Sequence, residues 1–155
     1  MISKNNPFNI RFDRFSHWKF CLGSTKGFCD FSDIRYGLRA GFILLRNYVY
    51  KKDLFTVEEV ISRYAPSTEN DTRGYISYVR NVLLTNGCTP DNLRSSGALL
   101  EYDNNFFYLC KAVLKMESGY VLDKVMYIDI IQSFNIKKVL YGSFSNKFTQ
   151  LTICY

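Results

Sequence analysis

Residues 104–119 combine a dense apolar run with a defined start and a defined end. The apolar positions are Phe106, Phe107, Leu109, Cys110, Ala112, Val113, Leu114 and Met116. They cover more than one face of a helix, and a helix that is apolar on several sides must be buried on several sides. Asp103 or Asn104 can cap its start, and Ser118-Gly119 ends it. We therefore predict a central helix in a mostly helical domain.

Capping signals divide much of the remaining chain into further helices. We predict helices over residues 33–50, 57–65, 72–86 and 122–134. Gly37 and Gly41, four residues apart in the first of these, invite a close neighbour. Thr56 and Glu59 form a capping box for the second, which must end before Pro66. The long helix 33–50 is expected to pack against the central helix.

The two ends of the chain look less regular. The first thirty residues carry many aromatics separated by polar residues and turns, which predicts an irregular lobe or a short hairpin. In residues 137–155, apolar and polar residues alternate as in a strand, but no further signal supports one. A C-terminal strand extension over 139–155 is therefore one possible interpretation. No repeat or linker divides the chain, and 155 residues that are 47% apolar can bury one core. We expect one mainly α (α+β) domain over residues 1–155.

Charge and hydropathy limit the partners. The net charge is +6 and the pI about 9.1, but the basic residues are scattered, so no nucleic-acid patch is indicated. No apolar run approaches the roughly 18 residues that a membrane span needs. Residues 1–7 are too polar for a signal peptide. We expect a soluble protein without a membrane span, made in the cytoplasm, so that a cell-wall target requires another route out.

Neither a metal nor a cofactor is expected. His17 is the only histidine, and its spacing to Cys21 and Cys29 does not match a zinc site. A thiol peptidase that uses His17 with one of these cysteines is a weak alternative, because the His comes first and lies close in sequence. The chain has five cysteines, an odd number whose spacing does not match a disulfide framework. We expect them to be reduced thiols that are mostly buried.

Glu117 is the main candidate for chemistry. It stands at the end of the apolar helix, in the segment Met116-Glu117-Ser118-Gly119. Glycosidic cleavage needs a carboxylic acid that keeps its proton near neutral pH, and apolar surroundings favour the protonated form of a carboxyl group. A solvated Glu before a glycine cap is the alternative interpretation.

Two resemblances favour the catalytic interpretation. The segment around Glu117 resembles the Glu-Ser-Gly helix end of lytic transglycosylases and bacterial glucosaminidases, where the Glu is the catalytic acid. Residues 5–11, Asn-Asn-Pro-Phe-Asn-Ile-Arg, resemble the Asn-Asn-x-Phe-Gly-Ile-Lys segment of the glucosaminidases. Trp18 and the stretch 28–32 match the Trp and the aromatic-x-aromatic-Ser motif that follow it there.

The closer resemblance is to phage virion-associated, lysozyme-like proteins that begin Asn-Asn-Pro-Gly-Asn-Ile-Arg. Their further motifs match Gly27-Phe28 with Phe31, Gly37-Leu38-Arg39-Ala40, Thr56, and Ala65-Pro66-Ser67-Thr68-Glu69-Asn70-Asp71-Thr72-Arg73-Gly74-Tyr75. The resemblance covers residues 5 to about 133. Two features depart from the patterns: Phe8 replaces a Gly of the phage set, and the Glu-Ser-Gly helix follows the Asn-Asn-Pro segment, whereas in glucosaminidases it precedes it. The second departure implies a circularly permuted lysozyme-like fold.

The resemblance implies a phage enzyme that cleaves the β-1,4 bond between MurNAc and GlcNAc of peptidoglycan, as a muramidase or a lytic transglycosylase. Glu117 would be the acid and base, and Glu69 is the favoured second carboxylate. Asp30, Asp33 and Asp71 are the other candidates, but the last two have sufficient roles as helix caps. A transglycosylase needs no second carboxylate, because the muramyl 6-hydroxyl is its nucleophile.

Several side chains could line a saccharide groove, with aromatic rings stacking on sugar faces and amides bonding hydroxyls. These are Asn6, Asn9, Arg11, Trp18, Asn70, Tyr75 and Tyr120. The expected partner is the glycan strand at the bacterial wall, reached either during lysis or from within the virion together with its components. The rival hypothesis is a non-catalytic virion structural or wall-binding protein that keeps the fold.

Overall fold

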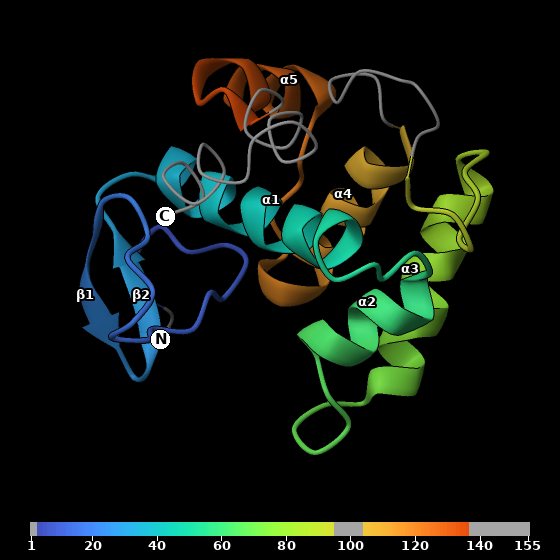
Figure 1. Ribbon diagram of the computed structural model, residues 1–155, viewed down its shortest axis with the longest axis horizontal. Coiled ribbons are helices and arrows are strands. Elements are labelled where there is room, and N and C mark those ends of the chain that lie inside the picture. The colour runs from blue at the N-terminus through green and yellow to red at the C-terminus, as the bar shows by residue number, and fades with distance from the viewer. Residues whose placement is uncertain (1–2, 95–103, 137–155) are drawn as a thin grey trace.

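The computed structural model describes residues 3–94 and 104–136. Its elements are β1 (Cys21–Thr25), β2 (Phe28–Phe31), α1 (Ile34–Tyr50), α2 (Val57–Tyr64), α3 (Thr72–Thr85), α4 (Asn104–Ser118) and α5 (Lys124–Ser133). The described part is therefore mainly helical with one small antiparallel sheet near the N-terminus, which confirms the α+β class (Figure 1). The predicted strand extension over 139–155 lies outside the described residues, as does Asp103.

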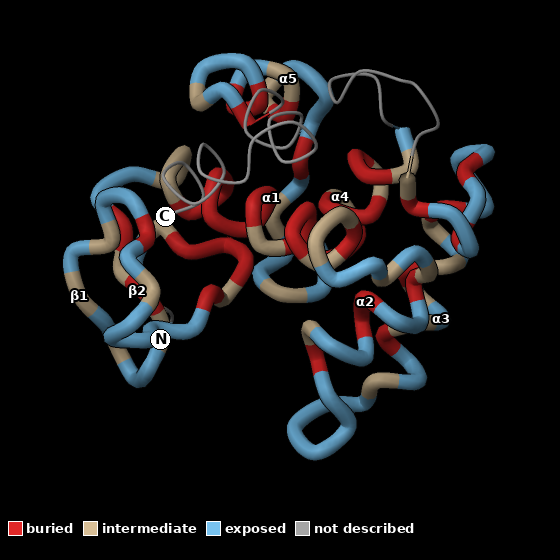
Figure 2. The backbone as a smooth tube through the Cα atoms, in the orientation of Figure 1, coloured by how far each residue is buried: buried red, intermediate tan, exposed pale blue. Residues whose placement is uncertain are grey.

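Helices α1 and α4 form the centre of the protein. Eleven of the 17 residues of α1 are buried, and α1 runs through the middle of the molecule (Figure 2). The buried residues of α4 are Phe106, Phe107, Leu109, Cys110, Ala112, Val113 and Leu114. Helix α4 packs against both α1 and α3. The predicted central helix and its packing against helix 33–50 are confirmed.

Side-chain caps begin the helices where the sequence predicts them. The Asp33 carboxylate accepts a hydrogen bond from the Arg35 backbone N–H at 2.8 Å and starts α1. The capping box of Thr56 and Glu59 starts α2, and the cap residue at its other end is Ala65, directly before the proline. Local hydrogen bonding thus determines these boundaries, and the capping predictions for these two helices are confirmed.

Helix α5 is shorter than predicted. It begins at Lys124 instead of Leu122 because the Asp123 side chain caps it, accepting a hydrogen bond from the Met126 backbone N–H at 2.8 Å. The buried Leu122 precedes the helix and belongs to the core without being helical. Because Leu122 is apolar and directly precedes the capping residue, it fits the helical pattern of the sequence although it lies two residues before the helix.

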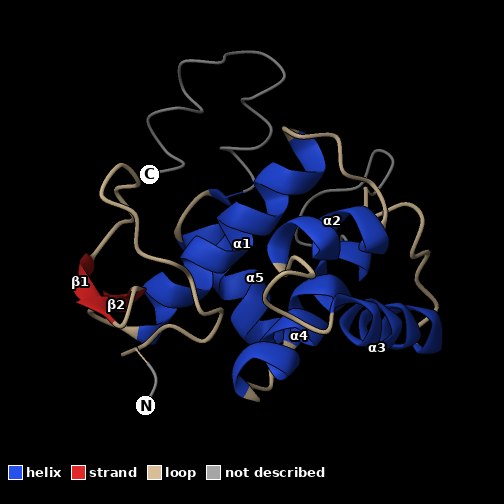
Figure 3. Cartoon of the chain, turned by 90° about the horizontal axis from the view of Figure 1, so that it is seen from below, coloured by secondary structure: helices blue, strands red, loops and turns tan. Residues whose placement is uncertain are grey.

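The N-terminal lobe contains a short hairpin, which was one of the two predictions for this region beside an irregular lobe. Strands β1 and β2 pair antiparallel, with Thr25 opposite Phe28 and an irregularity between Cys21 and Gly23. An isolated bridge joins Arg11 to Phe28 and attaches the preceding loop to the sheet. The hairpin lies at one end of α1, on the opposite side of the molecule from α3 (Figure 3).

The N-terminal loop lies directly on α1, at the two glycines that the sequence singled out. A Cβ atom at Gly37 would lie 2.0 Å from the Asn5 backbone oxygen, and one at Gly41 would lie 1.9 Å from Cδ2 of Phe8. Phe8 is fully buried and its ring packs edge-on against Phe42, with 5.8 Å between centroids. The absence of side chains at both positions therefore lets the loop approach the helix axis, as expected.

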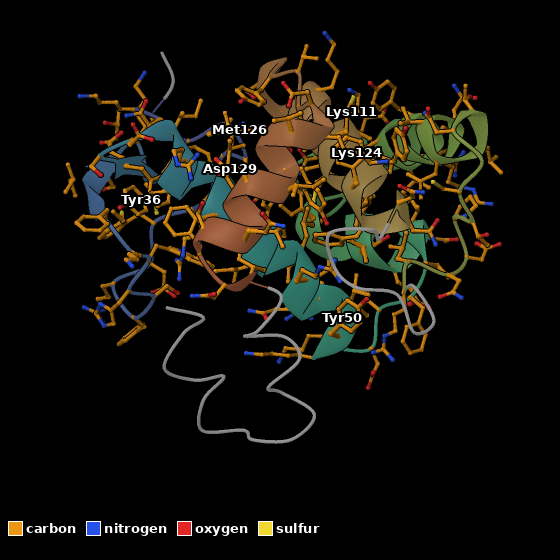
Figure 4. The ribbon with its side chains drawn as sticks, turned by 90° about the horizontal axis from the view of Figure 1, so that it is seen from above. Tyr36, Tyr50, Lys111, Lys124, Met126 and Asp129 are labelled. Atoms are coloured by element: carbon orange, nitrogen blue, oxygen red, sulfur yellow. The ribbon has the colours of Figure 1, made fainter. Side chains whose placement is uncertain are left out.

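Helix α5 packs against α1. Arg35 of α1 forms an ion pair with Asp129 of α5, and the rings of Tyr36 and Phe134 lie 5.4 Å apart. Asp129 and Tyr36 mark this contact in Figure 4. Within the described ranges, no helix combines the length and apolarity that a bilayer crossing requires.

The cysteines within the described residues are free thiols. Cys29, Cys88 and Cys110 are buried, while Cys21 is partly exposed. Burial, and then a hydrogen bond with the Cys21 thiol, raises the pKa of Cys29 to about 12. Such a thiol stays protonated and unreactive near neutral pH. Cys154 lies outside the described residues.

Candidate active site

Glu117 is held by two elements that are distant in the sequence. It lies in the last turn of α4 and is half-buried. The side-chain amide of Asn9 donates to its Oε2 at 2.8 Å and to its backbone oxygen at 3.2 Å. The Tyr75 hydroxyl of α3 donates to Oε1 at 3.0 Å. Both carboxylate oxygens therefore have fixed donors, and the orientation of the group is set before any ligand arrives.

The Tyr75 hydroxyl keeps its proton and so remains a hydrogen-bond donor to this carboxylate. Its side chain is buried, and burial raises the pKa of Tyr75 above its ordinary value. The nearby charge of Glu117 and the hydrogen bond between the two residues raise it further. The phenol therefore keeps its proton throughout the physiological pH range.

Hydrogen bonds within the N-terminal loop hold Asn9 at Glu117. Its backbone adopts a left-handed conformation, with φ of 54°, and its N–H donates to the Asn6 oxygen at 3.1 Å. The buried Asn6 side chain donates to the backbone oxygens of Ile10 and Cys29, both at 2.9 Å, and accepts from the Ile10 N–H at 2.8 Å. The structure thus places Asn6 inside the loop as its internal support.

A second anchor comes from α2. The Tyr64 hydroxyl donates to the backbone oxygen of Phe8, the residue before Asn9. Burial, and next the charge of Glu117, raises the pKa of Tyr64 well above its ordinary value. Tyr64 therefore stays protonated and remains a donor to the loop.

Glu117 opens onto a cavity of about 320 Å³ between the N-terminal lobe and the helices. Its lining residues are Asn9, Ile10, Arg11, Ser16, Trp18, Phe28, Leu44, Tyr48, Tyr64, Ala65, Glu69, Asn70 and Glu117. Aromatic rings and a few amides and charges face the same space. That combination suits a ligand with both apolar faces and hydroxyl groups, such as a sugar.

Most of the site residues expected from the sequence meet at this cavity. Asn9, Arg11, Trp18, Glu69, Asn70 and Glu117 line it, and Tyr75 touches Glu117. Tyr120 is partly exposed, and neither it nor Asn6 is among the lining residues. Burial, and then the charge of Asp123, raises the pKa of Tyr120.

The four candidates for a second catalytic carboxylate differ in whether they face the cavity. Glu69 faces the cavity and forms an ion pair with Arg11. Asp33 and Asp71 accept hydrogen bonds from backbone N–H groups as helix caps. Hydrogen bonds from the Thr25 hydroxyl and the Lys4 backbone N–H lower the pKa of Asp30, which therefore supports the hairpin. Among these four residues, only Glu69 shares the cavity with Glu117.

Sequence reasoning missed Leu44, Tyr48 and Tyr64. Leu44 and Tyr48 lie four residues apart on α1 and are only partly buried, so they form one helix face that points into the cavity. Tyr64 is the last residue of α2. A tyrosine directly before an Ala-Pro helix end was the available signal.

The fold and the site define a mainly helical protein with a half-buried carboxylate at an aromatic-lined cavity. Each oxygen of this carboxylate accepts a hydrogen bond from the protein. The chain is 38% identical over 84 residues to "Protein P5" of Pseudoalteromonas phage PM2. The match covers 52% of this chain and 52% of that protein, so it spans about half the length of the relative. No protein-family model matches the chain. The similarity connects the chain with a bacteriophage protein.

Proposed function

We propose that this protein is a phage enzyme that cleaves the β-1,4 glycosidic bond between MurNAc and GlcNAc in peptidoglycan, with Glu117 as general acid and then base. One observation carries the proposal: Glu117 faces the cavity while Asn9 and Tyr75 donate to its two carboxylate oxygens. A general acid requires this fixed orientation toward the substrate bond.

The reaction would proceed as follows. Glu117 in its protonated form gives its proton to the glycosidic oxygen, the carbon–oxygen bond breaks, and an oxocarbenium-like centre forms on the muramyl ring. The resulting Glu117 carboxylate accepts hydrogen bonds from Asn9 and Tyr75, which stabilise the charge as it develops. The carboxylate then removes a proton from the attacking hydroxyl group, and the starting form of the enzyme returns.

Two routes are open for the second step, and they differ in whether they use Glu69. Its carboxylate is held in the ion pair with Arg11. In the transglycosylase route the muramyl 6-hydroxyl attacks, so that one acid/base group is enough. A muramidase route would use water as the nucleophile and would need Glu69 to be released from Arg11.

The remaining lining residues support a saccharide ligand. Trp18 is almost completely buried, and its rigid ring beside the cavity offers a stacking surface for a sugar face. The Asn70 side chain is exposed at the rim and donates to the Pro66 oxygen at 3.3 Å. An exposed amide can also bond a sugar hydroxyl. The similarity to a phage protein supports a phage-related role, and within that role we propose action on the host wall, either in lysis or from the virion.

Zymography on murein tests the proposal directly. Wild type should clear a murein gel, and Glu117→Gln, which keeps the shape of the side chain but not its proton, should not. The matched control is Glu58→Gln, which removes an exposed acid in the first turn of α2. A protein that binds sacculi without clearing them, equally in all three forms, would instead be a wall-binding or virion structural protein.

A further inference from the structure

The ion pair between Arg11 and Glu69 joins two separate parts of the cavity rim. Arg11 belongs to the N-terminal loop and Glu69 to the connection between α2 and α3. Both residues line the cavity that contains Glu117. Their side chains are 66% and 51% exposed, so an incoming ligand can reach both partners.

Arg11 is the fixed partner of this pair. Its backbone forms a bridge to Phe28, and its guanidinium lies over the Phe28 ring, 5.3 Å from the centroid. These contacts hold Arg11 in place independently of Glu69.

Glu69 is the movable partner. It lies in the run 66–71, in which every residue is exposed. Its backbone N–H donates to the Pro66 oxygen at 3.0 Å, and this hydrogen bond holds the backbone turn without involving the side chain. An exposed ion pair in water contributes little net stability, so separation of the two charges is cheap. The guanidinium group can then accept another carboxylate through two parallel hydrogen bonds.

We propose that Arg11 is the receptor for a carboxylate of the substrate, and that Glu69 occupies this receptor until the substrate arrives. The inference rests on the proposed function and deepens it: the substrate is the peptide-bearing, anionic glycan of murein and not a neutral chitin-like glycan. Glu69 competes for Arg11 and repels a second carboxylate, so it weakens binding of anionic ligands generally. Arg11 thereby orients the glycan, so that a substrate carboxylate lies at the cavity rim and the glycosidic bond lies at Glu117.

Binding in a Glu117→Gln background, in which cleavage should be too slow to disturb a titration, tests this inference. The two probes are a murein disaccharide-peptide with free carboxylates and the same compound with its carboxylates amidated, both titrated by calorimetry. Arg11→Gln should weaken binding of the free-carboxylate probe by at least about tenfold. Glu69→Gln should strengthen it about threefold or more, because the receptor is then vacant. Binding of the amidated probe should change less than about twofold in either variant.

The matched control is Arg35→Gln, which breaks another exposed ion pair, with Asp129, on a part of α1 outside the cavity lining. It should leave binding of both probes unchanged. Equal affinity of the two probes for the Glu117→Gln parent, or weaker binding in Glu69→Gln, would overturn the inference while murein cleavage by wild type stands. If neither probe binds and wild type leaves murein intact, the proposed function fails and the inference fails with it.

Discussion

Gly41→Ala tests how the site is attached to the fold. In an ordinary helix interior this change stabilises by about 1 kcal/mol, because alanine is the better helix former. Here the new Cβ would lie 1.9 Å from Cδ2 and 2.2 Å from Cγ of Phe8, far inside van der Waals contact. Phe8 is held on both sides: its fully buried ring packs against Phe42, and the Tyr64 hydroxyl donates to its backbone oxygen.

The two effects can be compared in size. Inserting a methyl group into a packed core costs about 1–3 kcal/mol, and a contact this short belongs at the upper end of that range. After subtraction of the helix gain, Gly41→Ala should lose about 2 kcal/mol of unfolding free energy. Because Phe8 directly precedes Asn9, the displaced loop should also lose its bond to Glu117, and activity should fall together with stability.

Guanidinium unfolding followed by Trp18 fluorescence measures this effect, because the chain has one tryptophan and it is buried. The midpoint should decrease while the slope stays constant. Gly23→Ala is the matched control, since a Cβ there meets nothing within 4 Å. If Gly41→Ala unfolds at the wild-type midpoint or above it, the loop does not pack on α1 as described.

Three further outcomes are expected. Tyr75→Phe removes one donor to Glu117 and should slow murein clearing about tenfold with little change in the unfolding midpoint; an unchanged rate would count against a positioning role. The pKa of Asp30 is lowered in the folded state, so its stabilisation is present above the ordinary Asp pKa of about 3.9 and is lost as pH falls through the folded value. Asp30→Asn should therefore be less stable than wild type at pH 7 and equal to it near pH 2; the same stability gap at both pH values would refute this. Burial holds the Cys29 thiol protonated, so iodoacetamide at pH 8 should leave it unmodified in the folded protein. In denaturant without reductant all five thiols should react, and a count of three would indicate a disulfide.

The helices could be predicted because their boundaries are local. Capping by Asp33 and by the Thr56–Glu59 pair depends on residues within one turn, and so does the end of α4 after Ser118. The burial of α4 on several sides follows from its composition alone. None of these features requires knowledge of a distant contact.

The site was harder to predict because its contacts are long-range. Asn6 and Asn9 carry the same side chain three residues apart, and only the folded loop decides that Asn6 supports the backbone while Asn9 faces Glu117. Tyr75 lies 42 residues and Asn9 lies 108 residues from Glu117, so their meeting depends on how α3 and the loop pack onto α4. Tyr64 was missed for the same reason, since its partner lies 56 residues away.

The central claim is that Glu117 cleaves the glycan of peptidoglycan, and mass spectrometry of digested sacculi tests it most directly. Wild type should release anhydromuropeptides if the muramyl 6-hydroxyl is the nucleophile, or fragments with reducing MurNAc ends if water is the nucleophile. Glu117→Gln should yield these products about 10²- to 10⁴-fold more slowly, the usual contribution of general-acid catalysis. Products that consist only of reducing GlcNAc ends, equal yields from wild type and Glu117→Gln, or intact glycan with both proteins would contradict the claim.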